Sequence, residues 1–148
     1  MNDIWNTRFM SMAREVSTWS KDPSSKIGSV AVGDNNRILA MGYNGFPRGI
    51  EDTPGRLNDR DIKLSLVVHA EMNCIYNATY SGVSLVGAAM YVYGLPICSD
   101  CCKGVIQVGI SRVYISQNSL LDCKPFWRDS WKRSTEMFYE ANVSIVEI

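Results

Sequence analysis

The chain has 148 residues, of which 46% are hydrophobic and 20% are charged, as in ordinary globular proteins. This length suits one domain over residues 1–148 that buries enough surface to fold without disulfides. Fifteen basic residues balance fifteen acidic ones, so the net charge is zero. The balance argues against a nucleic-acid partner, because it provides no broad positive surface.

The sequence also predicts a cytoplasmic protein with no membrane partner. No apolar run approaches the roughly 18 residues that a membrane span needs, and MNDIWNTRFM lacks the parts of a signal peptide. Thiols stay reduced in a cytoplasm. The five cysteines are an odd number and include the adjacent Cys101 and Cys102. We therefore expect metal ligation or core packing of these cysteines, and no disulfide framework.

The first predicted elements are a helix and a hairpin. Apolar residues from Trp5 to Trp19 recur every three or four positions, which predicts a helix over Asn2–Ser20 with Asn2 or Asp3 as its cap. The segments KDPSSKIGSVAVG and RILAMGY, joined by DNN, predict two antiparallel strands. Residues 44–63 have no period and are rich in Gly, Pro, Asp and Arg. We interpret them as a functional loop.

In the rest of the chain, predicted helices alternate with predicted strands. The strands are AMYVYG, RVYIS and VSIVEI, and the helices are His69–Tyr80, Ser99–Val108 and Phe126–Ala141. This order predicts an α/β fold of three layers, in which helices cover both faces of a five-stranded mixed sheet that is mostly parallel. The chain shows no internal repeat and no domain boundary.

Two short stretches carry residues suited to binding zinc. His69 is the only histidine, and Cys98 and Cys101 lie three residues apart, both stretches at the start of a predicted helix. The partial positive charge of a helix amino terminus favours a thiolate, the form that binds zinc. Three protein ligands leave the fourth tetrahedral position to water, which is the pattern of a catalytic zinc.

Glu71 gives this site a predicted reaction. Two residues after His69, it can lie beside the metal and move protons without being a ligand. Zinc lowers the pKa of a bound water from 15.7 to about 7, and a general acid–base group adds a rate factor of about 10² to 10⁴. Water attack at an amino-substituted ring carbon, followed by loss of ammonia, is hydrolytic deamination.

The sequence resembles the cytidine deaminase superfamily and, within it, the deoxycytidylate (dCMP) deaminases. The zinc signature of nucleobase deaminases is H-x-E followed by P-C-x-x-C. Here HAE occupies residues 69–71 and PICSDC residues 96–101, with Ile97 as an extra residue. The segments DPSSKIGSVAV, GYNGFPRG, HAEMNCIYNA and PICSDCCKGVIQVGISRVYI carry the resemblance, whereas CKPFWRDSWKRSTEM, after Asp122, matches no part of it.

The resemblance implies a cytidine-deaminase-like fold and the deamination of dCMP to dUMP, the precursor for thymidylate synthesis. One catalytic Zn²⁺ per chain would be held by His69, Cys98 and Cys101, with Glu71 as the proton shuttle. Substrate contacts would be Ser25 and Lys26 with the phosphate, Asn44 with the sugar hydroxyl, and the backbone of Ala70 with the pyrimidine carbonyl. With no second histidine, we expect no structural zinc.

The resemblance also implies allosteric control and assembly into a homohexamer. In this family dCTP activates and dTTP inhibits, and Mg²⁺ can accompany the triphosphate. The candidate effector contacts are Gly42, Tyr43, Asn44, Gly45, Arg48 and Arg56.

Two alternatives remain open. A deaminase of the same fold could act on cytidine, guanine or a tRNA adenosine. A non-catalytic zinc module would instead close the fourth position with Cys74 or Cys102. Our interpretation of Cys74, Cys102 and Cys123 is packing as small hydrophobes. We expect the aromatic residues Trp127, Trp131, Phe138 and Tyr139 to pack a helix. For Arg56 and Arg60, two interpretations stay open: a functional role, or charges on a loop that only contact solvent.

Overall fold

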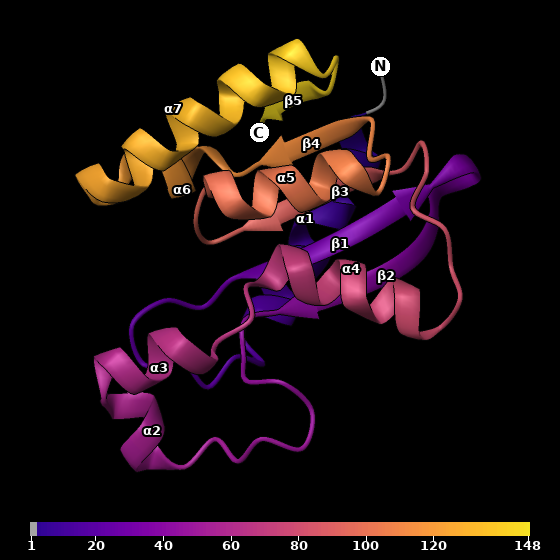
Figure 1. Ribbon diagram of the computed structural model, residues 1–148. Coiled ribbons are helices and arrows are strands. Elements are labelled where there is room, and N and C mark those ends of the chain that lie inside the picture. The colour runs from indigo at the N-terminus through magenta and orange to yellow at the C-terminus, as the bar shows by residue number, and fades with distance from the viewer. Residues whose placement is uncertain (1–2) are drawn as a thin grey trace.

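The computed structural model describes residues 3–148, and a five-stranded sheet with helices on both faces forms its framework (Figure 1). The strands are β1 (Gly28–Gly33), β2 (Arg37–Tyr43), β3 (Ala89–Tyr93), β4 (Arg112–Ile115) and β5 (Ser144–Glu147). The helices are α1 (Asp3–Ser17), α2 (Pro54–Asn58), α3 (Arg60–Leu66), α4 (Ala70–Tyr80), α5 (Ser99–Gln107), α6 (Gln117–Leu121) and α7 (Pro125–Glu140). No helix among residues 3–148 has the length and apolar character needed to cross a bilayer.

The sheet is mixed, as the sequence predicted. Its strand order is β2-β1-β3-β4-β5, and β1 and β2 form the expected antiparallel hairpin. Strand β1 also runs antiparallel to β3, whereas β3, β4 and β5 pair in parallel. Half of the pairings are therefore antiparallel, more than the alternating order of elements led us to expect.

The helices divide between the two faces of the sheet. Alternate residues of a strand point to opposite faces, and Met90 and Val92 of β3 join the core shared with α4, α5 and α7. Their neighbour Tyr91 faces the other way and packs in the cluster that contains Phe9 of α1. In Figure 1, α1 accordingly lies behind the sheet, with α4 and α5 in front of it.

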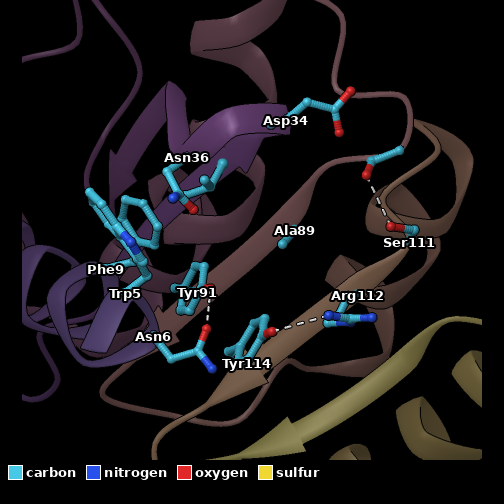
Figure 2. A pocket seen from close by; sticks show the side chains of 13 residues that line it. Trp5, Asn6, Phe9, Asp34, Asn36, Ala89, Tyr91, Ser111, Arg112 and Tyr114 are labelled. Atoms are coloured by element: carbon cyan, nitrogen blue, oxygen red, sulfur yellow. Dashed lines mark hydrogen bonds between the residues drawn. The ribbon is translucent and has the colours of Figure 1, made fainter. Parts of the chain in front are cut away.

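A shallow cavity of about 580 Å³ lies on the α1 face (Figure 2). Tyr91 and Tyr114 stack there with ring centroids 4.2 Å apart, and the Tyr91 hydroxyl donates to Asn6 Oδ1 over 2.8 Å. Because these tyrosines point away from α4 and α5, the cavity is separated by the sheet from the predicted metal ligands.

The predicted loop over residues 44–63 was wrong in part, because two short helices begin within it. The Thr53 side chain accepts from the backbone N–H of Arg56 at the start of α2, and Asp59 accepts from that of Ile62 at the start of α3. Helix α6 was also missed. Helices of five to seven residues are too short to show a hydrophobic period. Of the caps proposed for α1, Asn2 lies outside the described residues.

Candidate active site

Two helix starts bring the three predicted metal donors together. His69 precedes α4 directly, Cys98 precedes α5, and Cys101 lies in the first turn of α5. His69 Nδ1 is 3.3 Å from Cys101 Sγ and 3.5 Å from Cys98 Sγ. A tetrahedral zinc with Zn–S of about 2.3 Å and Zn–N of about 2.0–2.1 Å would separate sulfur and nitrogen by about 3.5 Å. The donor set therefore fits zinc in both chemistry and spacing.

Local helix capping explains the position of the cysteines. The Sγ atom of Cys98 accepts a hydrogen bond from the backbone N–H of Cys101 over 3.5 Å, so Cys98 is the N-cap of α5. The cap fixes both sulfur atoms relative to the same helix turn. Across the site, His69 is the residue before the first turn of α4 and brings its ring to these sulfurs.

The electrostatics of the cluster favour a thiolate at Cys98. A hydrogen bond from Cys101 lowers the pKa of Cys98 to about 4, against the effect of burial, and His69 lowers it further. The same hydrogen bond raises the pKa of Cys101, and the bond to Cys98 raises the pKa of His69. One thiolate is thus ready to bind a metal, and a metal cation would favour loss of the second thiol proton.

Glu71 lies beside this cluster without belonging to it. Its side chain is buried, with only 4% exposed, and burial raises the pKa of its carboxyl to about 7. The carboxyl interacts with the Cys101 thiol and the His69 ring, but it is no member of the three-donor group. A carboxyl placed next to a metal site, and not in it, is suited to transferring protons.

The remaining buried cysteines near the site keep their protons. Burial raises the pKa of Cys74 to about 12 and that of Cys102 to about 11. The Cys102 thiol donates to the backbone carbonyl of Ser134. Within residues 3–148, the group of closely spaced donors comprises only His69, Cys98 and Cys101. The geometry therefore gives no support to a fourth cysteine ligand and a closed structural zinc site.

A cavity of about 380 Å³ opens onto the cluster. Six of the residues predicted from the sequence line it: Ser25, Asn44, His69, Ala70, Glu71 and Cys98. Lys26 is exposed and lies outside the lining. The lining also includes residues that the sequence analysis did not assign to the site, namely Asp22, Arg60, Lys63, Lys124 and Trp127.

Asn44 joins the cavity to the loop that precedes β1. Its Oδ1 accepts from the backbone N–H of Ile27 over 2.9 Å, and its Nδ2 donates to the Ser25 carbonyl over 2.8 Å. A primary amide has two N–H donors. One donor of Asn44 is therefore still available to a ligand in the cavity.

Asp22 and Lys63 form a buried ion pair in the cavity wall. Lys63 Nζ is 3.0 Å from Asp22 Oδ1, and the two residues are only 6% and 8% exposed. Burial opposes ionisation of Asp22, but backbone N–H groups of Ser25 and Ser24, together with Lys63, lower its pKa below the usual value. Since the partners are 41 positions apart in the sequence, no local sequence pattern predicts the pair.

The extra residue of the zinc motif is accommodated against α7. The Ile97 side chain is fully buried, and its carbonyl accepts a hydrogen bond from Ser134 Oγ over 2.8 Å. Pro96 and Cys98, on either side, line the cavity. The same docking places Trp127 at the cavity, where its ring meets His69 edge-on at 6.3 Å between centroids. Trp127 is therefore more than the packing residue that we expected.

The predicted effector residues lie outside this cavity, apart from Asn44. Arg48 donates to Asn77 Oδ1 on α4 and stacks on Tyr80 with 4.9 Å to the ring centroid. Arg56 donates to the carbonyl of Glu51 over 2.9 Å. Gly45 pairs with Val68 in an isolated antiparallel bridge next to His69. The GYNG segment therefore has a structural role, because it holds the residues directly before α4.

The fold and site together define a class: the zinc-dependent deaminases that act on nucleobase rings. The family model "Cytidine and deoxycytidylate deaminase zinc-binding region" matches residues 3–117. The chain therefore belongs to this family. An uncharacterized deaminase from the luxG 3' region of Aliivibrio fischeri is 36% identical over 141 residues, covering 95% of this chain and 91% of that protein.

Two further comparisons agree with this assignment. The deoxycytidylate deaminase of Mus musculus is 39% identical over 123 residues, covering 80% of this chain and 67% of the mouse enzyme. The crystal structure of dCMP deaminase from the cyanophage S-TIM5 has a TM-score of 0.74 and covers 100% of both chains. At 22% sequence identity, this likeness shows a shared fold.

Proposed function

We propose that the protein deaminates dCMP to dUMP and ammonia, a reaction that supplies the precursor of thymidylate. The observation that carries the proposal is the buried Glu71 carboxyl beside the His69, Cys98 and Cys101 donors, with Glu71, His69 and Cys98 lining one cavity. Relatives that cover four fifths of the chain are named deoxycytidylate deaminases. The cyanophage S-TIM5 enzyme of the same fold has been solved in complex with dCMP and dUMP.

His69, Cys98 and Cys101 would hold one Zn²⁺ per chain, since their spacing matches tetrahedral zinc. When bound, zinc supplies a Lewis acid that lowers the pKa of water to near 7. Glu71 accepts one proton of the attacking water and delivers it to the ring nitrogen, where it stays; it then takes the second proton from the newly formed hydroxyl and delivers it to the amino group, which leaves as ammonia when its bond to the ring carbon breaks. Its burial keeps solvent from competing for this proton.

The remaining contacts orient the nucleotide. Ala70 is the first residue of α4, so its backbone N–H has no partner within the helix and can donate to the pyrimidine carbonyl. The second N–H of the Asn44 amide can donate to a sugar hydroxyl. Ser25 lines the cavity and can meet the phosphate, whereas Lys26 would have to reach in from outside the lining.

We also propose that dCTP activates the enzyme and dTTP inhibits it, with Mg²⁺ bound to the triphosphate, in a homohexamer. The resemblance to the family supports this proposal. Gly42 to Gly45, Arg48 and Arg56 remain the candidate effector contacts, and Arg48 could transmit a signal because it touches α4, the helix that begins at the active site.

Ammonia release from dCMP, deoxycytidine and dCTP, each with and without dCTP or dTTP as effector, tests both proposals. We expect turnover of dCMP that dCTP raises and dTTP suppresses. The mass of the assembly in solution, a separate measurement, should be six times that of the chain. Turnover that ignores both effectors would contradict the proposed regulation alone. A zinc-loaded protein that leaves dCMP intact but deaminates cytidine, guanine or a tRNA adenosine would contradict the proposed substrate.

A further inference from the structure

We propose that Arg60 and Lys124 form a two-cation clamp that holds the phosphate of the nucleotide and makes the enzyme select nucleotides over nucleosides. This inference rests on the proposed function. Arg60 is the first residue of α3, and Lys124 immediately precedes α7. Both residues line the cavity that opens onto the metal donors, although 64 positions separate them along the chain.

The charges of the cavity wall leave these two cations free. Asp22 and Lys63 neutralise each other at 3.0 Å. Neither Arg60 nor Lys124 has a side-chain hydrogen bond or ion pair with any residue in the range 3–148. Besides the buried Glu71 at the metal donors, the lining holds one carboxylate with no ion pair within residues 3–148, Asp122, which lies two positions before Lys124 in the sequence. Two unpaired cations at one cavity are suited to a ligand with more than one negative charge.

The loop before β1 cannot supply the missing positive charge by itself. The backbone N–H groups of Ser24 and Ser25 both donate to Asp22 Oδ1, over 2.8 and 3.1 Å, and are therefore unavailable to a phosphate. Lys63 Nζ donates to Asp22 and to Ser24 Oγ. The Ser24 and Ser25 hydroxyls can donate to phosphate oxygens, but among the lysine and arginine residues of the lining only Arg60 and Lys124 have no acidic partner within residues 3–148.

The depth of the cavity places the clamp at the correct end. Glu71 and Ala70 are buried at the metal cluster, where the base must react, whereas Arg60 and Lys124 are exposed at the mouth. A nucleotide whose base is held at the cluster carries its phosphate at the far end of the molecule. The phosphate would then lie at the mouth, within reach of two long and flexible side chains.

The part of the clamp contributed by Lys124 lies beyond residue 117, where the match to the family model ends. The shortest hydrogen bonds that hold helix α7 over the site are those from Ser134 Oγ to the Ile97 carbonyl and from the Ser99 N–H to Ser130 Oγ, each over 2.8 Å. These bonds tie the helix that follows Lys124 to the zinc motif itself. Recognition of the phosphate is therefore linked to a segment whose sequence alone suggested no role.

The variants Arg60→Gln, Lys124→Gln and the double variant test the clamp, with Lys132→Gln and Arg133→Gln as controls on the exposed surface of α7. For each zinc-loaded protein, kcat/KM is measured on dCMP and deoxycytidine, and the dissociation constants of dUMP and inorganic phosphate by calorimetry. Each single variant should lose about 10-fold or more on dCMP through a higher KM, since hydrogen bonds to charged groups contribute about 1.5–3 kcal/mol. Turnover of deoxycytidine should not change.

Asp122→Asn provides a test of opposite sign, because removal of the free carboxylate should tighten dUMP binding a few-fold. Raising the ionic strength should weaken binding of dUMP to the unaltered protein and leave binding of deoxyuridine unchanged. Equal losses on dCMP and deoxycytidine, or dUMP binding that is unchanged in the double variant, would overturn the clamp. If the unaltered protein fails to turn over dCMP, the proposed function is wrong, and the calorimetry still reports separately whether these cations bind phosphate.

Discussion

At the scale of single residues, the buried pair of Asp22 and Lys63 sets a clear expectation for acid stability. Because the folded-state pKa of Asp22 is lowered, its contribution to stability is present above its ordinary pKa of 3.8 and is lost as the pH falls through the folded-state pKa. Breaking a buried pair leaves an unpaired charge and costs about 3–5 kcal/mol.

The variant Asp22→Asn should therefore lower the free energy of unfolding at pH 7 by about 3 kcal/mol, measured by urea denaturation. Its stability should also fall less than that of the unaltered protein as the pH drops below 4. Asp52→Asn is the matched control, because Asp52 pairs with Lys21 at the surface and its loss should cost at most about 1 kcal/mol. Equal effects of the two variants would contradict the role given to Asp22.

The proximity of the candidate metal donors and the Glu71 carboxyl could be predicted from the sequence, whereas part of the cavity wall could not. Two short segments contain these residues, namely His69, Glu71, Cys98 and Cys101. Within each segment the residues are two or three positions apart at the start of a helix, so their spacing in the sequence already places them close together. Lys63 and Lys124 reach the site only through tertiary packing, so their neighbours along the chain carry no signal of it.

At the scale of elements, the packing of β2 against α4 fixes the position of α4, the helix that begins directly after His69. A Cβ atom at Gly42 would lie 2.3 Å from the backbone nitrogen of Cys74 and 2.6 Å from the carbonyl oxygen of Ala70. Both of these atoms belong to the backbone of α4, so the helix would have to move as a unit. Gly42 is therefore explained by close approach of the two elements, independently of any effector.

Gly42→Ala should lower the free energy of unfolding by about 1–3 kcal/mol and reduce zinc affinity, since α4 begins next to His69. Urea denaturation and zinc titration measure these two effects. Gly55→Ala is the control: it lies in α2 with its nearest neighbour 4.0 Å away, and alanine favours a helix by about 1 kcal/mol. A Gly42→Ala protein with unchanged stability would show that α4 can shift without cost.

The sequence predicted the long elements well and the short ones poorly. Helices α4, α5 and α7 begin and end within about two residues of their predicted bounds, since each carries a hydrophobic period or a glycine at its end. Helices α2 and α3 depend on the single caps Thr53 and Asp59, which resemble ordinary loop residues in a sequence.

At the scale of the whole molecule, the three-layer arrangement separates catalysis from the α1 face. The site forms where α3, α4, α5 and the start of α7 meet the loops that precede β1 and follow β2 and β3. The alternation of helices and strands predicted this architecture, but it could not reveal that β1 pairs antiparallel with β3. Strand order depends on which hydrophobic faces meet, and no local pattern encodes that.

The central claim is that Glu71 transfers protons beside a zinc held by His69, Cys98 and Cys101. The most direct test is the rate of ammonia release from dCMP by Glu71→Gln, with the zinc content of the same sample and with zinc-free Cys98→Ala as the control for metal loss. We predict one zinc per chain in Glu71→Gln and a kcat at least 100-fold below that of the unaltered protein. A zinc-loaded Glu71→Gln protein that deaminates dCMP at the unaltered rate would contradict the account.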